Sequence, residues 1–192
     1  MSESNYKTII DQMNELKNQY YVENDKKHFF KKQQKMKIAS AISEKIDIRE
    51  VLARTYFNIP NTHHVYFDYT VFKIYANPSN YALIVSYAVQ MIDACVKKYG
   101  FYEMHINLHS FSISALERYR ECIDLYLNEC IKSNTEYYKV IACLHIYHTP
   151  SVFDTIANML SKLIHPEIKQ KVKKYGKTES ESIIQNIFSS LA

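Results

Sequence analysis

Glycine is almost absent from this chain: its 192 residues contain only Gly100 and Gly176. A loop that cradles a phosphate needs several glycines within a few residues, because backbone N–H groups must approach the anion closely. The P-loop, the Rossmann fingerprint, the kinase glycine-rich loop and the G-x-S-x-G nucleophile elbow all depend on such glycines. The sequence therefore excludes the commonest motifs of nucleotide-binding enzymes and hydrolases, and we expect no cofactor.

Cysteine pairs and long apolar runs are missing as well. The four cysteines form no C-x-x-C pair and lie in apolar stretches, which is typical of small core residues in a reducing cytoplasm. The most apolar window, Tyr81–Val96, contains Gln90 and Asp93 and falls short of the roughly 20 residues that span a bilayer. Residues 1–24 are polar and do not resemble a signal peptide. We therefore expect a soluble, cytoplasmic protein.

Positive charge is modest overall, at a net +4, but lysines crowd the stretch from residue 26 to 37, which contains no acid. Cations attract anionic lipids and aromatic rings insert at the interface, so this stretch has the composition of a peripheral membrane contact. The candidate membrane-binding residues are Lys26, Lys27, Phe29, Phe30, Lys31 and Lys32. A solvated helix face has the same composition. No recognised nucleic-acid module accompanies the lysines, so we do not expect a nucleic-acid partner.

The first 60 residues are predicted to form a helical N-terminal segment. Residues 4–57 contain no glycine or proline, and apolar residues such as Ile38 and Ile42 recur at helical spacing. The pattern changes at Pro60, where a polar break precedes a β-branched and aromatic run. We therefore place the main domain at residues 61–192.

Strand patterns alternate with helical ones in the main domain. Glu103–Phe111 alternates between apolar and polar residues, and Val140–Tyr147 is apolar on both faces, as expected of an interior strand covered by helices. Val65–Ala76 is rich in aromatic and β-branched residues and is predicted as a strand or a strand pair. A helix is predicted from Pro166 to near Gly176. The alternation predicts an α/β layer fold, with helices covering a sheet.

The C-terminal third combines a strand that ends in a proline turn, an amphipathic helix, a second proline, and a short basic stretch before glycine. The residues that carry this order are Pro150, Phe153, Leu163-Ile164, Pro166, Lys171-Val172 and Gly176. This order resembles the CRAL-TRIO family of intracellular lipid-binding domains. Residues Ile106–Ile113 are similar to an earlier strand and turn of that family, with Asn107 in place of its usual aspartate and Ser110 in place of its glycine. The resemblance implies a mixed, largely parallel sheet.

The resemblance also implies non-enzymatic binding or transfer of a hydrophobic ligand, such as a phospholipid, between the sheet and a gate helix after Pro150. Lys171 would meet the headgroup as a positive point charge. The residues expected to line the cleft are Phe111, Leu144, Phe153, Ile156, Met159, Leu160 and Leu163. Two alternatives stay open. The same residues could fill a closed core in a scaffold that binds a protein partner, and Lys171 could be solvated among neighbouring lysines.

Four histidines raise the question of a metal site, because zinc is commonly held by three or four such ligands. Strand alternation places His105 and His109 on one face, whereas His145 and His148 would point to opposite sides. We therefore expect no metal site. No serine or cysteine lies in a context that would activate it as a nucleophile, so we expect no enzyme.

Overall fold

The computed structural model describes residues 3–23, 31–132, 136–189 and 191. A five-stranded sheet lies at its centre, with the strands in the order β1-β2-β3-β4-β5. The strands are β1 (Tyr56–Asn58), β2 (His64–Asp68), β3 (Tyr102–Asn107), β4 (Ile141–Tyr147) and β5 (Val172–Lys174). The helices are α1 (Glu3–Glu23), α2 (Lys31–Ser43), α3 (Ile48–Thr55), α4 (Tyr69–Tyr75), α5 (Tyr81–Tyr99), α6 (Ile113–Arg118), α7 (Arg120–Lys132), α8 (Tyr137–Val140), α9 (Phe153–Met159), α10 (Pro166–Gln170) and α11 (Lys177–Ser189).

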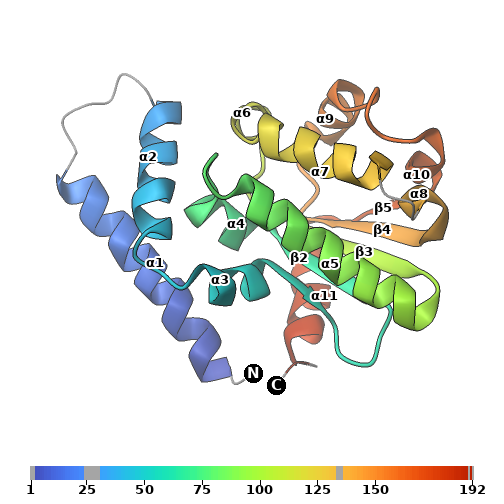
Figure 1. The fold of residues 1–192 in the computed structure, drawn as a ribbon, viewed down its shortest axis with the longest axis horizontal. Helices are drawn as coiled ribbons and strands as arrows, with labels where there is room; N and C mark the ends of the chain where they lie inside the picture. Colours follow the sequence, from blue (N-terminus) through green and yellow to red (C-terminus); the bar gives the residue numbers. More distant parts are fainter. Residues whose placement is uncertain (1–2, 24–30, 133–135, 190, 192) are drawn as a thin grey trace.

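The sheet is mixed and largely parallel. β1 runs antiparallel to β2, and the pairs β2–β3, β3–β4 and β4–β5 are all parallel. Helices α5 and α7 lie over one face of the sheet (Figure 1). Helix α11 packs on the other face, where the ring of Phe188 contacts those of Phe57 and Tyr66. The predicted α/β class, with helices covering a largely parallel sheet, is therefore confirmed.

The segment Val65–Ala76 was expected to be entirely β, and that prediction is wrong beyond Asp68. The Asp68 carboxylate accepts hydrogen bonds from the Thr70 N–H (2.7 Å) and the Thr70 hydroxyl (2.6 Å), which caps the start of α4. Five of the seven residues of α4 are buried. A helix buried on most of its sides shows no polar face, so its sequence looks like that of a buried strand.

The helix expected from Pro166 to near Gly176 is also shorter than predicted. Helix α10 ends at Gln170, and the chain then joins the sheet as β5. Leu144 of β4 donates its N–H to the Lys171 carbonyl (2.9 Å), and Tyr175 donates its N–H to a β4 carbonyl (2.9 Å). Pairing with the free edge of β4 outweighs the helical pattern of the segment, because strand formation depends strongly on tertiary context.

The N-terminal helices share a hydrophobic core with the main domain. Met13 of α1 and Ile42 of α2 are buried in one cluster with Tyr75 of α4. Strand β1 comes before residue 60, yet its Tyr56 pairs with Phe67 of β2 and stacks on its ring, with centroids 4.6 Å apart. The expected boundary at residue 60 thus lies between two paired strands.

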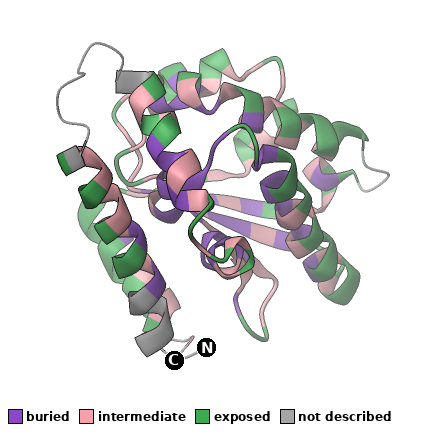
Figure 2. Ribbon diagram, turned by 60° about the vertical axis from the view of Figure 1, so that its left-hand side comes forward, coloured by how far each residue is buried: buried purple, intermediate pink, exposed green. Residues whose placement is uncertain are grey.

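Buried residues gather on the sheet and on the helix faces that turn toward it, while the outer helix faces are exposed (Figure 2). None of the helices within the described ranges combines the length and the apolar character that crossing a membrane requires.

Candidate functional site

A large cavity lies against the face of the sheet that α7 covers. Its volume is about 1120 Å³. Alternate residues of parallel strands point to the same face, so the register of β2 to β5 brings apolar side chains together in adjacent rows. These side chains form the floor of the cavity: Phe67, Met104, Ile106, Leu144, Ile146 and Val172.

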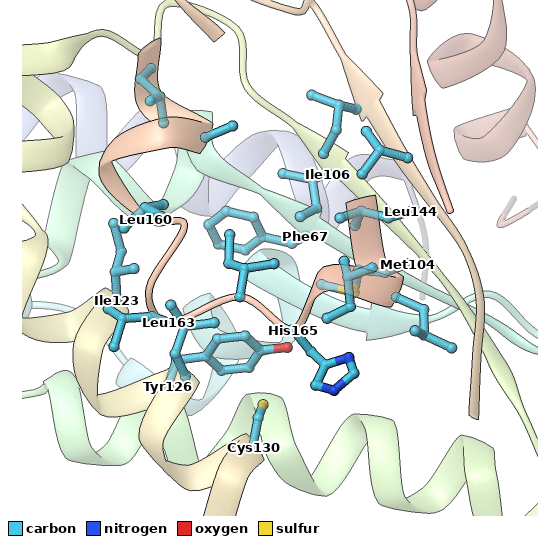
Figure 3. A pocket seen from close by; sticks show the side chains of 18 of the residues that line it. Phe67, Met104, Ile106, Ile123, Tyr126, Cys130, Leu144, Leu160, Leu163 and His165 are labelled. Atoms are coloured by element: carbon cyan, nitrogen blue, oxygen red, sulfur yellow. The ribbon is translucent and has the colours of Figure 1, made fainter. Parts of the chain in front are cut away.

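Two further elements enclose the cavity (Figure 3). Helix α7 contributes Ile123, Tyr126 and Cys130, which recur at helical spacing and therefore share one face. A second wall is formed by α9 and by the segment that leads to α10, whose Leu160 and Leu163 lie beside Ile123 and Tyr126. The cavity is thus bounded by the sheet, by α7 and by the region after Pro150 that the sequence indicated.

Most of the residues expected to line a cleft do border this cavity. They are Phe111, Leu144, Phe153, Ile156, Leu160 and Leu163. Met159 does not, and its 41% exposure shows why: Ile156 and Leu160, four residues apart, occupy the cavity side of α9, while Met159 faces solvent. The helical spacing of Ile156 and Leu160 was predicted correctly, but Met159 was wrongly included among the residues on the cavity side of the helix.

Lys171 does not border the cavity. Its ammonium group donates hydrogen bonds to the backbone carbonyls of Tyr138 (2.8 Å) and Lys139 (3.4 Å), which belong to α8. Lys171 therefore ties the start of β5 to α8. The sequence expectation of a headgroup contact at this lysine is not supported by its geometry.

Other charged residues, which the sequence interpretation missed, border the cavity instead. Lys174 shares a strand face with Val172 and forms an ion pair with Asp154 (2.8 Å). The His165 ring stacks on Tyr138, with centroids 3.9 Å apart. The remaining charged residues of this rim are Glu136, Lys162 and Lys169. Only the assignment of β5 as a strand would have revealed the orientation of Lys174.

The polar groups on the α7 wall are neutral at physiological pH. Burial raises the pKa of the Cys130 thiol to about 11. Burial also raises the pKa of the Tyr126 phenol well above its ordinary value, and the neighbouring Cys130 adds to this effect. An apolar ligand would meet hydrogen-bonding groups on this wall but no ionised one.

The opposite face of the sheet carries a polar network. His145 is hydrogen-bonded through Nε2 to Glu103 Oε2 (2.7 Å) and through Nδ1 to the Tyr175 hydroxyl (2.8 Å). The His105 ring stacks on that of His145, with centroids 4.4 Å apart, and pairs with the Tyr147 hydroxyl (2.7 Å). Burial lowers the pKa of His105 to about 3, and the charges of its histidine neighbours add to this effect. His105 is therefore neutral at physiological pH.

The histidine arrangement differs from the one expected. His148 was predicted to point away from His145, but β4 ends at Tyr147 and His148 has a φ of 49°. Strand alternation therefore stops before it, and His148 pairs through Nδ1 with Asn107 Oδ1 (3.1 Å), on the face that carries His105. His109 lies against His148, with ring centroids 4.9 Å apart.

The predicted membrane contact falls almost entirely outside the structure. Lys26, Lys27, Phe29 and Phe30 lie outside the described residues, and so do the side chains of Lys31 and Lys32 at the start of α2. The membrane contact therefore stays a prediction.

Comparison with known proteins found no matching family model and no curated protein of matching sequence. The resemblance to CRAL-TRIO domains therefore rests on the residues that carry it, chiefly those from Pro150 to Gly176.

Proposed function

We propose that this protein binds a hydrophobic ligand without chemically altering it, and that the ligand is a phospholipid or a similar amphiphile held between the sheet and α9. The observation that carries the proposal is the apolar cavity. Its volume of about 1120 Å³ exceeds the range of about 300–1,000 Å³ that is usual for small-molecule sites. A space of this size lined by side chains such as Phe67, Ile106 and Leu144 favours an apolar occupant.

The distribution of charge supports an amphiphile over a uniformly apolar ligand. The floor and the α7 wall supply apolar and neutral groups, whereas charged side chains come from Glu136 before α8, from the α9–α10 region and from β5. Lys174 is paired with Asp154, but Lys162 and Lys169 form no ion pair within the described part of the chain. Lysine is a compact charge that suits a phosphate. We therefore expect the headgroup near Lys162 and Lys169, with the acyl chains over the sheet.

The segment from residue 152 to 171 suits a gate. Helices α9 and α10 are short, with Ile156 the buried residue of α9 and no buried residue anywhere along α10. Segments with few buried contacts open at low free-energy cost. The gate also agrees with the resemblance to CRAL-TRIO domains, in which the corresponding region covers the lipid.

The alternative of a protein-binding scaffold requires a closed interior, and the cavity argues against it. Contact with an anionic membrane and a cytoplasmic location are proposed along with lipid transfer, because a transfer protein must meet the surface from which it takes its cargo.

The first test is identification of lipid in protein purified from an expression host, by native mass spectrometry and by analysis of organic extracts. A fluorescent-phospholipid binding assay then measures the affinity. We expect one bound lipid molecule per protein chain. Absence of lipid from repeated extractions together with no binding of fluorescent phospholipids would overturn the proposal.

Two tryptophan substitutions on α7 locate the site. Ile123→Trp places an indole ring in the cavity next to the expected acyl chains and is expected to weaken lipid binding at least tenfold. Leu125→Trp, at a position on the same helix that is 37% exposed and outside this cavity, is the matched control and should bind like the wild type. Equal affinities of the two variants would place the lipid elsewhere.

A further inference from the structure

Three metal-ligating side chains converge on the face of the sheet opposite the cavity. Glu103 of β3 and Cys143 of β4 are direct partners across two parallel strands. His145 lies two residues beyond Cys143 and therefore on the same face. One ligand atom from each of the three side chains lies within 4.8 Å of the other two. The parallel register thus brings a carboxylate, a thiol and an imidazole to one place.

The imidazole of His145 is already held in an orientation that suits coordination. Its Nδ1 is hydrogen-bonded to the Tyr175 hydroxyl (2.8 Å), and its Nε2 faces Glu103 Oε2 (2.7 Å). Histidine ligands of metals characteristically have their second ring nitrogen fixed by such a partner. Tyr175 can keep this role while an ion replaces the direct contact between Glu103 and His145.

A fourth donor lies beside the same carboxylate. His63 Nε2 is 3.5 Å from Glu103 Oε1, whereas His145 contacts the other carboxylate oxygen. The side chains of both Glu103 and His63 are partly exposed, so an ion can reach the carboxylate from solvent. His64, which follows His63, belongs with it and Glu103 to a second, overlapping group of donors.

We propose that Glu103, Cys143 and His145 bind one Zn²⁺ ion, and that His63, which belongs with His64 and Glu103 to the overlapping group, turns toward the ion as its fourth ligand. Zn²⁺ accepts oxygen, nitrogen and sulfur ligands in a tetrahedral arrangement. A thiolate and two imidazoles are poor ligands for Mg²⁺ and Ca²⁺, which prefer oxygen. This site lies on the other face of the sheet from the lipid cavity, so neither proposal depends on the other.

This site could not be predicted from the sequence. Its donors lie at four separate positions of the chain, and they come together only through the register of the strands. Alternation along β4 places Cys143 with His145, but nothing in the sequence aligns either residue with Glu103. His63 precedes β2 and joins the group from outside the strand pattern.

The test uses the reduced chain of 192 residues and Co²⁺ as a spectroscopic substitute for Zn²⁺. We expect one Co²⁺ per chain, with a thiolate-to-cobalt charge-transfer absorption that Zn²⁺ abolishes and that excess Mg²⁺ or Ca²⁺ leaves unchanged. Cys143→Ser should remove this absorption. Cys95→Ser, a control at a buried thiol that instead contacts the Phe101 carbonyl, should retain it.

Competition with a chromogenic chelator measures the Zn²⁺ affinity. Glu103→Gln and His145→Asn should each weaken it at least tenfold, and His63→Ala should weaken it less because water can take the fourth position. Circular dichroism checks that each variant is folded. If Cys143→Ser does not fold, X-ray absorption of the zinc-loaded wild type decides, with one Zn–S distance of about 2.3 Å expected.

Three results would overturn the assignment. The first is Co²⁺ binding with no thiolate absorption. The second is an absorption that survives Cys143→Ser. The third is Zn²⁺ binding that a combined His63→Ala and His64→Ala variant abolishes but Cys143→Ser does not, which would move the ion to the histidine pair.

Discussion

The ammonium group of Lys171 donates a hydrogen bond to the backbone carbonyl of Tyr138 at 2.8 Å. This contact joins the start of β5 to α8 and leaves Lys171 outside the residues that border the cavity. Lys171 therefore has a structural contact, whereas other lysines border the cavity and can reach a ligand. The sequence alone did not distinguish the two kinds of lysine.

Lys171→Met should lower the free energy of unfolding by about 1–2 kcal/mol, because a hydrogen bond from a charged donor to a partly buried carbonyl is lost. Urea denaturation measures this change. Lys173→Met, at an exposed position of β5 two residues further along the chain, is the control and should be nearly neutral. Phospholipid affinity should be unchanged in both variants. An unchanged stability with weaker lipid binding would restore the headgroup role to Lys171.

Ile42→Ala tests whether the N-terminal helices belong to the main core. Ile42 is buried in the cluster that includes Tyr75 and Tyr81. Its truncation should cost about 2–5 kcal/mol while unfolding remains a single transition. Far-ultraviolet circular dichroism and tyrosine fluorescence should report the same midpoint. Val22→Ala on α1, at a position 82% exposed, should have little effect. Two separate transitions would show that residues 1–60 fold independently.

Alanine should be tolerated differently at the two glycines. Gly100 ends α5 with a φ of 82°, where a Cβ atom is strained, so Gly100→Ala should destabilise the protein by about 1 kcal/mol. Gly176 has no positive φ, and a Cβ atom at this position would meet no neighbouring atom within 4 Å. Gly176→Ala should therefore be neutral or should stabilise the protein by about 0.4–1 kcal/mol. Thermal unfolding of both variants provides the measurement, and equal losses would contradict the assigned conformations.

His148 should make stability depend on pH. Burial lowers its pKa below the ordinary value of 6.5, with His109 adding to the effect, so the unfolded chain binds a proton more readily than the folded one. Stability therefore falls as the pH drops below about 6.5. His148→Asn, which tolerates the positive φ of 49°, should reduce this fall. The loss of stability is measured as the change in the thermal midpoint between about pH 8 and pH 5. If the midpoint changes equally with pH in the wild type and the variant, the role of His148 is refuted.

Sequence patterns located β3 and β4 because their side chains alternate or are apolar throughout, and these patterns reflect burial directly. They failed at α4, where burial on most sides hides the helical period, and at β5, where a free strand edge selects the conformation. Both failures have the same physical origin, since tertiary context overrides local preference.

The candidate cavity was predicted in part for the same reason. Ile156, Leu160 and Leu163 follow helical spacing that the sequence displays, but the contribution of α7 depends on how that helix crosses the sheet. The polar cluster around Glu103 depends on register between strands that are far apart in the chain. The pattern of one strand shows which of its residues share a face, but not which residue of the next strand lies beside each of them.

Strands β3 and β4 are a shared wall between the two proposed sites. Met104 and Leu144 face the cavity, while their neighbours Glu103 and Cys143 face the other side. An occupant of the cavity that displaced the backbone of these strands at Met104 and Leu144 would displace Glu103 and Cys143 with it. The two binding equilibria are then linked, and by reciprocity the factor by which lipid changes ion affinity equals the factor by which the ion changes lipid affinity.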